Sequence, residues 1–325
     1  MKVGVLGTGD ISKAYMKASA IAGIITEAVF NRDLSKAESF AHRYAIPKAY
    51  DNYEAFLADQ GFDTVYVGLP NGLHYEYALN ALKCGKNVII EKPFCSNLRE
   101  FNELVNTANE HKRFIIEMDR VQALPNFKSI RDHIGNIGVI SAVSANYSQY
   151  SRKYDAYLNG VVGNVFTTEC SGGALMDLGV YAVHDIVALF GMPKKVSYKV
   201  NKLETGVDIS GHLLMEYEGF NATVIVSKNS IGNKHFMIQG VEGSIYSASA
   251  PGVINSLELI TREGTEDISY QQPYDGFAYT LMEIKDIIDN RNFEKYRNRL
   301  TQSKKVMTVL DAARKSAGIV FSADC

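Results

Sequence analysis

The chain has 325 residues, a hydrophobic fraction of 46% and a formal net charge of −2. At roughly 150 residues per domain the length predicts two domains, and the composition excludes a disordered chain, a collagen and a coiled coil. The near-neutral charge also argues against a nucleic-acid partner, because phosphates require a basic surface.

The first 120 residues alternate short apolar runs with helical patterns. Strands are predicted at 3–6, 26–30, 49–50, 64–67, 87–90 and 114–116, and helices from residue 11 and over 35–44, 76–83 and 98–111. Such alternation with short loops is typical of parallel strands joined by right-handed crossovers. Residues 1–120 are therefore predicted to form an α/β domain of the Rossmann type, with a doubly wound parallel sheet.

The pattern changes near Pro125. Helices are predicted over 126–134, 174–189, 277–291 and 303–321, with an alternating strand over 139–150 and mostly strands after Lys194. Glycines in the runs 217–220, 241–244 and 262–265 fall where hairpin turns need a positive φ. Residues 121–325 are therefore predicted to form an α+β domain with a large, mostly antiparallel open sheet.

The first motif is Gly7-Thr8-Gly9-Asp10-Ile11-Ser12, between the first predicted strand and the first predicted helix. Gly7 allows a tight turn, Gly9 lets a pyrophosphate approach the backbone at the helix N-terminus, and the small Ser12 lets helix and strand pack closely. A plain turn is the alternative, but the position in a βαβ unit favours dinucleotide binding. Residues 7–12 are therefore predicted to contact a nicotinamide dinucleotide.

The end of the second predicted strand selects between the two nicotinamide cofactors. The sequence there is Asn31-Arg32-Asp33, with Lys36 one turn further on. An arginine accommodates the 2′-phosphate of NADP, whereas an acidic residue would bind the 2′-hydroxyl of NAD. Because Asp33 comes late for that role, we expect Asn31, Arg32 and Lys36 to contact NADP(H), with NAD(H) as the alternative cofactor. A solvated loop charge is the alternative for Arg32.

Glu91-Lys92-Pro93 follows the fifth predicted strand, and Pro70, Asn71 and His74 follow the fourth. The carboxyl ends of parallel strands line the ligand crevice of a doubly wound sheet. A lysine there can donate to a substrate oxygen, and the proline fixes a turn through a trans or a cis bond. These residues are predicted to line the cofactor site, and Asn71 to reach the substrate as well. A surface lysine is the alternative for Lys92.

The helical pattern over 174–189 carries Asp177, Tyr181 and His184 at positions i, i+4 and i+7. The three side chains are therefore predicted to share one helix face, where they offer the donors and acceptors that a hydroxyl or carbonyl substrate needs. The preceding Gly172-Gly173 pair is expected to let the backbone approach a flat ring. The alternative is an ordinary capped helix with a polar stripe.

These motifs together resemble the Gfo/Idh/MocA oxidoreductases, the family of glucose–fructose oxidoreductase and inositol dehydrogenase. The resemblance covers essentially the whole chain and rests on GTGDIS at 7–12, Pro70-Asn71 with His74, GKNVIIEKP at 85–93 and GGALMDLGVYAVHD at 172–185. The segment around Asp177 resembles the dihydrodiol dehydrogenase branch, which has tyrosine where inositol dehydrogenases have histidine. Ser171 and the run Asp119-Arg120-Val121-Gln122 depart from the family pattern, which leaves the substrate open.

The resemblance implies an NAD(P)-dependent dehydrogenase or reductase that transfers hydride between nicotinamide and a secondary alcohol or ketone of a sugar, polyol or cyclic diol. It implies that Lys92 and Tyr181 contact the reacting oxygen, with Tyr181 as the acid/base and Lys92 as the alternative acid/base. Asp177 would hold the sugar or orient Lys92, and His184 would bind a neighbouring hydroxyl. The other readings are an NAD-dependent inositol or sugar dehydrogenase and a catalytically silent nucleotide-binding sensor.

Partners and location follow from what the sequence lacks. Its four cysteines form no CxxC pair and have no zinc-ligand spacing, and its N-terminal run reaches glycine too soon for a signal peptide. No run approaches the roughly 20 apolar residues of a membrane span. We therefore expect a cytoplasmic protein with a small-molecule substrate and no metal, membrane or nucleic acid as partner. The resemblance also implies a homodimer or homotetramer formed through the open sheet, with Tyr147 expected on the outer face.

Overall fold

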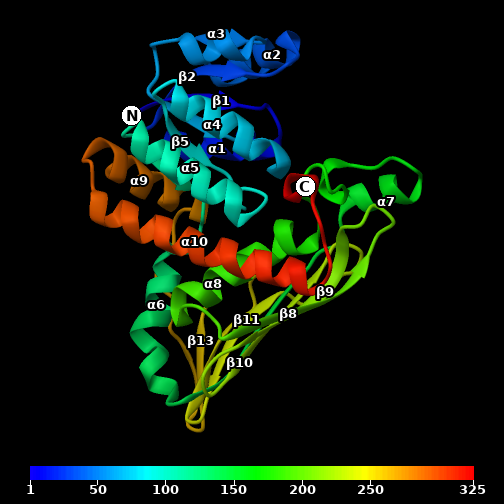
Figure 1. Cartoon of the computed structure of the whole chain (residues 1–325). Coiled ribbons are helices and arrows are strands. Elements are labelled where there is room, and N and C mark those ends of the chain that lie inside the picture. Colours follow the sequence, from blue (N-terminus) through cyan, green and yellow to red (C-terminus); the bar gives the residue numbers. More distant parts are fainter. The chain divides into compact units, whose positions relative to one another are not determined.

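The computed structural model describes residues 1–325, and the chain divides into two compact units (Figure 1). Unit 1 consists of Met1–Met118 and Phe277–Thr301, and unit 2 consists of Asp119–Gly276 and Gln302–Cys325. The sequence predicted a single division near residue 120, so it assigned the segment Phe277–Thr301 to the second domain, whereas this segment packs in unit 1.

Unit 1 is built on a six-stranded sheet in which every strand pairing is parallel. The strand order is β3 (Lys48–Tyr50), β2 (Ile25–Phe30), β1 (Lys2–Leu6), β4 (Thr64–Val67), β5 (Asn87–Ile90) and β6 (Ile115–Glu117). The order reverses between β1 and β4, and doubly wound sheets bind their ligands beyond the strand ends at such a point. The predicted Rossmann fold is therefore confirmed.

Helices cover both faces of this sheet, as the alternation of side chains along β1 illustrates. Val3 and Val5 join a buried cluster with α1, α2 and α9, whereas Gly4 faces the opposite side, where a Cβ would lie 2.6 Å from the ring of Phe56 on α3. The helical elements are α1 (Asp10–Ile21), α2 (Leu34–Tyr44), α3 (Tyr53–Ala58), the 3₁₀ turn η1 (Asn71–Leu73), α4 (His74–Lys83), α5 (Leu98–Glu110), α9 (Gly276–Asp289) and the first part of α10 (Phe293–Ser316).

The segment Phe277–Thr301 belongs to unit 1 because it packs against apolar side chains of β4 and of the residue that precedes β6. Phe277 packs against Tyr66 of β4 with 6.5 Å between ring centroids, and Tyr296 meets Phe114 edge-on at 4.9 Å. The N-terminal ammonium group also pairs with Asp289 at 2.7 Å. Without α9, part of the apolar sheet face that α1 and α2 leave uncovered would meet water.

Unit 2 is built on an eight-stranded sheet that is antiparallel except between β7 and β10. The strand order is β14 (Gly264–Asp267), β13 (Glu258–Thr261), β12 (Gly243–Ser247), β11 (His235–Gly240), β7 (Ile140–Ser148), β10 (Asn221–Ser227), β9 (Asp208–Glu216) and β8 (Lys195–Lys202). The predicted second domain with a large, mostly antiparallel sheet is therefore confirmed.

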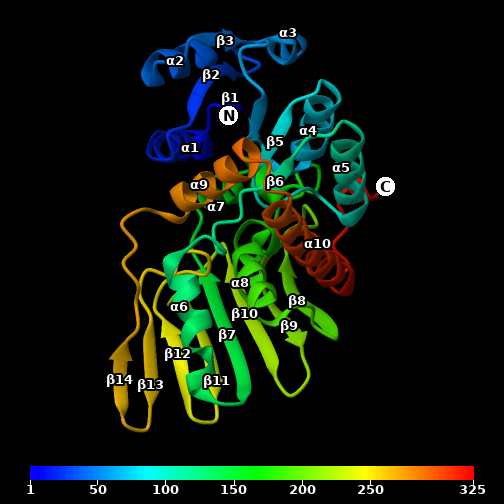
Figure 2. The same ribbon diagram turned by 90° about the vertical axis from the view of Figure 1, so that its left-hand side faces the viewer.

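Helices lie on one face of this sheet, and none lies across the other face (Figures 1 and 2). The covered face receives Val143 and Ala145 of β7, which are buried. The helical elements of unit 2 are α6 (Pro125–His133), α7 (Arg152–Leu158), α8 (Val180–Phe190), the second part of α10, the 3₁₀ turns η2 (Ile134–Ile137), η3 (Asn164–Phe166) and η5 (Ser322–Asp324), and the π-helical turn η4 (Leu175–Gly179). No helix of the chain has both the length and the apolar character needed to cross a membrane.

Two local predictions for this region need correction, and one helix was missed. Gly219 and Gly264 have φ of +84° and +144°, as hairpin turns require, but Gly243 has no positive φ. Gly243 is the first residue of β12, and a Cβ there would lie 2.6 Å from the carbonyl oxygen of Ile260 on the neighbouring strand. The last helix begins at Phe293 rather than near residue 303, and α7 was not predicted.

Candidate functional site

The turn from β1 into α1 leaves space above its second glycine. Gly7 has a φ of +93°, and its N–H donates to the carbonyl of Phe30 at 3.0 Å. Gly9 caps α1 with an ordinary φ of −75°, and no protein atom lies within 4 Å of a Cβ built there. Ser12 is buried beside Gly68, where a larger side chain would prevent close packing. The backbone conformation and the protein surroundings at position 9 would therefore also allow a larger residue. A pyrophosphate bound close to the helix N-terminus would require glycine there.

The end of β2 is followed by the exposed Arg32 and by Asp33, whose carboxylate caps the helix α2. Asp33 caps α2, and hydrogen bonds from Ser35 and Lys36 lower its pKa. Lys36 also pairs with Asp33 through its ammonium group at 3.2 Å. Asn31 donates to the hydroxyl of Thr8 at 2.7 Å, which links β2 to the glycine-rich turn. Arg32 and Lys36 are both exposed at this position, and the ammonium group of Lys36 is paired with Asp33.

The segments after β4 and β5 are joined through a buried histidine. His74, the first residue of α4, has its ring nitrogens 2.9 Å from the carbonyl oxygen of Leu69 and 3.0 Å from that of Pro93. Burial lowers the pKa of its imidazole. Pro70 and Asn71 lie on the segment that His74 holds, just before α4. The predicted cofactor residue His74 thus fixes two neighbouring loops.

Glu91 and Lys92 differ in exposure although they are adjacent. Glu91 is buried and accepts a hydrogen bond from the hydroxyl of Tyr66 at 2.8 Å, whereas Lys92 is partly exposed. The bond between Lys92 and Pro93 is cis. Unit 1 thus brings the predicted cofactor residues to the carboxyl ends of β1, β2, β4 and β5, with Lys92 following β5 directly.

Asp177, Tyr181 and His184 lie on a helical segment that is not regular. Asp177 lies in the π-helical turn η4, and Tyr181 and His184 lie in the α-helix α8 that follows. The predicted uninterrupted α-helix is therefore wrong at its first turn, which carries an extra residue. Such π turns are frequent at functional sites.

The glycine pair before this turn is required by the protein itself. A Cβ at Gly173, whose φ is +110°, would collide with the carboxylate of Asp208, and a Cβ at Gly172 would collide with the carbonyl of Val165. Asp208 Oδ2 accepts a hydrogen bond from the N–H of Leu175 at 2.7 Å. Packing within unit 2 is therefore sufficient to explain why both positions are glycine.

Tyr181 is packed by three separate segments of unit 2. Its ring centroid lies 5.8 Å from that of Tyr147 on β7 and 5.8 Å from the guanidinium carbon of Arg120. A Cβ at Gly252 would lie 2.7 Å from its Cδ1 atom. Tyr147 therefore lies on the helix-covered side of the sheet, and its expected position on the outer face is wrong.

Sequence reasoning missed Lys228 and the partners of His184. Lys228, whose side chain is only 6% exposed, donates a hydrogen bond from Nζ to Oδ2 of Asp177. His184 is buried with its Nδ1 3.7 Å from Oδ1 of Asp119. Two features of the sequence could have indicated these contacts. Lys228 is a single lysine at the end of an apolar strand, and Asp119 is an acidic residue in the run 119–122.

Asp185 follows His184 and is fully buried. One carboxylate oxygen accepts a hydrogen bond from the N–H of Gly252 at 3.0 Å, and the other has no hydrogen-bond partner. Burial raises its pKa to about 8, and the neighbouring Asp119 adds to the increase. Asp185 therefore holds the segment that packs against Tyr181, and its burial favours the neutral carboxylic acid over the carboxylate.

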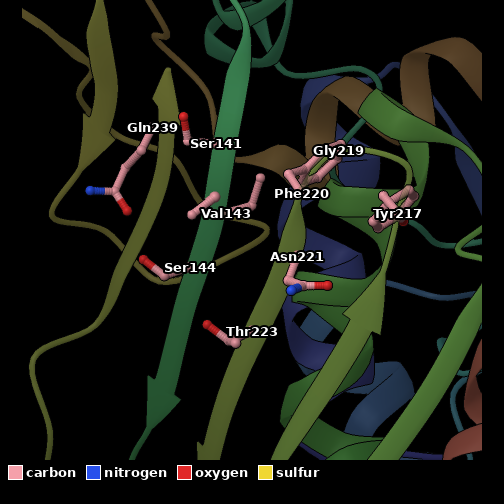
Figure 3. A pocket seen from close by; sticks show the side chains of 10 residues that line it. Ser141, Val143, Ser144, Tyr217, Gly219, Phe220, Asn221, Thr223 and Gln239 are labelled. Carbon is pink, nitrogen blue, oxygen red and sulfur yellow. The ribbon is translucent and has the colours of Figure 1, made fainter. Parts of the chain in front are cut away.

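The outer face of the sheet in unit 2 carries a hollow of about 540 Å³ (Figure 3). Its lining includes Ser144, Thr223 and Gln239, which come from β7, β10 and β11. None of the predicted site residues lines it. The chain has no group of three or more histidine, cysteine, aspartate or glutamate side chains suited to hold a metal ion.

Comparison with known families decides what this arrangement belongs to. Residues 1–118 match the model of the GFO/IDH/MocA oxidoreductase family with an NAD-binding Rossmann fold, and residues 131–246 match the model of a GFO/IDH/MocA C-terminal domain. The chain belongs to the GFO/IDH/MocA family. The predicted family and its NAD(P)-dependent oxidoreductase activity are therefore confirmed.

Family members similar over their full length include two kinds of dehydrogenase. The scyllo-inositol 2-dehydrogenase (NADP⁺) of Bacillus subtilis is 33% identical over 100% of this chain and 99% of its own length. A trans-1,2-dihydrobenzene-1,2-diol dehydrogenase of Xenopus tropicalis is 28% identical over 98% of this chain and 99% of its own. A 3-ketoreductase from Actinomadura kijaniata, solved with NADP, has the same fold with a TM-score of 0.83 at 20% identity, covering 99% of each chain.

The space above Gly9 predicts that Gly9→Ala weakens dinucleotide binding without weakening the fold. A φ of −75° suits alanine, so we expect the free energy of unfolding to change by less than about 0.5 kcal/mol. The added methyl group would occupy space needed by the pyrophosphate, so we expect NADPH affinity, measured by fluorescence titration, to fall roughly tenfold. Gly135→Ala, at an equally open position in unit 2, is the matched control. Equal NADPH affinity in both variants would contradict the assignment.

The raised pKa of Asp185 predicts how stability depends on pH. Because the folded-state pKa exceeds that of the unfolded chain, the folded protein binds the extra proton between about pH 4 and pH 8, and the free energy of unfolding falls as pH rises through this range. Asp185→Asn cannot ionise and still accepts from Gly252, so we expect a flatter pH dependence in urea unfolding.

Asp286→Asn is the control for this experiment. Asp286 is exposed, and hydrogen bonds from Lys295 and Asn290 lower its pKa, so it titrates below the range of interest. Its substitution is expected to leave the slope between about pH 5 and pH 8 unchanged. A wild-type slope in Asp185→Asn would mean that Asp185 is ionised in the folded protein.

Proposed function

We propose that the protein is an NADP(H)-dependent dehydrogenase or reductase that acts on a secondary alcohol or ketone of a sugar, polyol or cyclic diol. The observation that carries this proposal is the placement of Asp177 and Tyr181 on adjoining turns, with Tyr181 packed by three segments and Asp177 partly exposed. The full-length relatives named for inositol and for a dihydrobenzene diol support a ring alcohol as the substrate class.

In unit 1 the proposed cofactor site follows the strand ends. Gly7 to Ser12 would hold the pyrophosphate at the start of α1, and Arg32 would pair with the 2′-phosphate. Asn31, Lys36, Pro70, Asn71, His74, Glu91 and Pro93 complete the proposed set. Of these, His74, Glu91 and Pro93 are buried and would act by fixing the loops. When bound, the nicotinamide would supply or accept the hydride.

The proton is handled by the chain's own side chains. Tyr181 would donate a proton to the carbonyl oxygen in reduction and accept it in oxidation, and the charge of Lys92 would stabilise the developing alkoxide. Lys92 remains the alternative acid/base. Asp177 would accept a hydrogen bond from a substrate hydroxyl, and Asn71 and His184 are the further proposed substrate contacts. The buried position of His184 beside Asp119 favours a supporting role for it over direct contact.

Two readings remain as competitors. An NAD-dependent inositol or sugar dehydrogenase would use the same unit 2 residues but would not need Arg32. A catalytically silent nucleotide-binding sensor would have no chemical need for Lys92, Asp177 and Tyr181 together, and the full-length similarity to dehydrogenases supports the enzyme.

Assembly and location belong to the same proposal. The helix-free face of the sheet in unit 2 supports a homodimer or homotetramer formed through that face. The four cysteines are free thiols, which supports a reducing cytoplasm. Unit 1 would then be the NAD(P)-binding part and unit 2 the part for substrate binding and oligomerisation.

Removing either proposed proton-handling group should abolish turnover while sparing the cofactor. We expect Tyr181→Phe and Lys92→Met to lower kcat by about 10²–10⁴-fold in NADPH oxidation with a panel of ketoses, inososes and diketones, because general acid–base catalysis contributes that much. NADPH affinity should stay within about threefold of wild type. Tyr44→Phe and Lys83→Met, on α2 and α4, are the matched controls. Near wild-type turnover in both test variants would refute the mechanism.

Cofactor preference gives a separate test. We expect a lower dissociation constant for NADPH than for NADH, and a loss of NADPH affinity of about tenfold or more in Arg32→Ala, because one charge-assisted phosphate contact disappears. NADH affinity should not change. Arg43→Ala, at an exposed position in the last turn of α2, is the control. Tighter binding of NADH by the wild-type protein would refute this role of Arg32.

A further inference from the structure

Lys228 is a buried lysine that lies outside every motif of the sequence. It directly follows β10, and its side chain is 6% exposed. Its backbone is held on both sides, since its N–H donates to the carbonyl of Ile209 at 2.9 Å and its carbonyl accepts from the N–H of Ser151 at 2.8 Å. Its ammonium group is therefore presented from a fixed backbone position.

The partner of this ammonium group is the carboxylate of Asp177. Lys228 Nζ donates a hydrogen bond to Asp177 Oδ2, and the Asp177 side chain is 35% exposed. One end of the pair is thus buried and the other reaches the surface of unit 2. An ion pair with a buried lysine loses much of its hydration. The attraction between the two charges offsets this loss only where the distance and the hydrogen-bond geometry are good.

A second carboxylate lies near the same lysine. Burial raises the pKa of Asp208, and the positive charge of Lys228 opposes this increase. Asp208 binds the N–H of Leu175, at the start of the π-helical turn that carries Asp177. Lys228 therefore acts on both the side chain of Asp177 and the group that anchors its backbone.

We propose that Lys228 is a positioning residue that fixes the carboxylate of Asp177 for binding a substrate hydroxyl next to Tyr181. This inference rests on the proposed function, because it gives Asp177 a task in the reaction. An apolar residue at position 228 would remove the hydrogen bond that Lys228 Nζ donates to Asp177 Oδ2. The hydroxyl of the substrate would then meet a carboxylate whose Oδ2 atom is no longer fixed by this contact.

The test is a double-mutant cycle with Lys228→Met, Asp177→Asn and the double variant. Each is measured for kcat and KM with NADPH and the best ketone of the panel, and for its urea midpoint. If Lys228 acts through Asp177, Lys228→Met lowers kcat/KM at least tenfold in the wild-type background and less than twofold in the Asp177→Asn background. The double variant removes both charges and is expected to unfold at a higher urea concentration than the less stable single variant.

Lys202→Met is the matched control, since Lys202 is an exposed lysine of the same unit and is expected to leave kcat/KM unchanged. An equal loss in both backgrounds, or wild-type kcat/KM in Lys228→Met, overturns the positioning role while the proposed function stands. A wild-type protein that reduces no member of the panel overturns the proposed function and this role with it.

Discussion

The buried carboxylate of Asp208 fixes the backbone on which the candidate chemistry of unit 2 depends. Its Oδ2 atom accepts hydrogen bonds from the N–H of Leu175 at 2.7 Å and from the hydroxyl of Tyr198 at 2.6 Å. Because the same carboxylate fills the space beside Gly173, only glycine fits at this position before the π-helical turn. Asp177 and Tyr181 follow within the next turns, so their positions depend on this contact.

The fold of unit 1 could be predicted because parallel strands covered on both faces are continuous apolar runs, as Val3 to Leu6 and Val88 to Ile90 are. The location of α9 could not. Its buried residues Phe277, Leu281 and Ile284 form an apolar stripe that could pack against either sheet. The local sequence pattern of a helix does not indicate which sheet the helix will cover. The assignment is decided by contacts with residues such as Tyr66, which is more than 200 positions away in the sequence.

In the candidate site, too, local features could be predicted from the sequence and long-range contacts could not. Within the glycine-rich turn the residues are close in sequence, and so are those within the segment around Tyr181. In each segment, spacing alone therefore indicated that its own residues lie together. Lys228 lies 51 positions from Asp177, and Asp119 meets His184 across a similar separation, so neither pairing could be deduced from spacing. The π-helical turn was also hidden, because α and π turns use the same residue types and differ only in where the backbone is held.

The polar residues of η4 and α8 are more than a solvated stripe on an ordinary helix. A solvated stripe would leave its charges in water, whereas here His184 is buried with Asp119, Asp185 is fully buried, and Asp177 is tied to a buried lysine. Replacing such buried pairs by apolar residues is often neutral or stabilising, so the stability of the fold does not by itself explain them. The cost of burying these groups around one tyrosine therefore supports the proposal that Tyr181 takes part in the reaction.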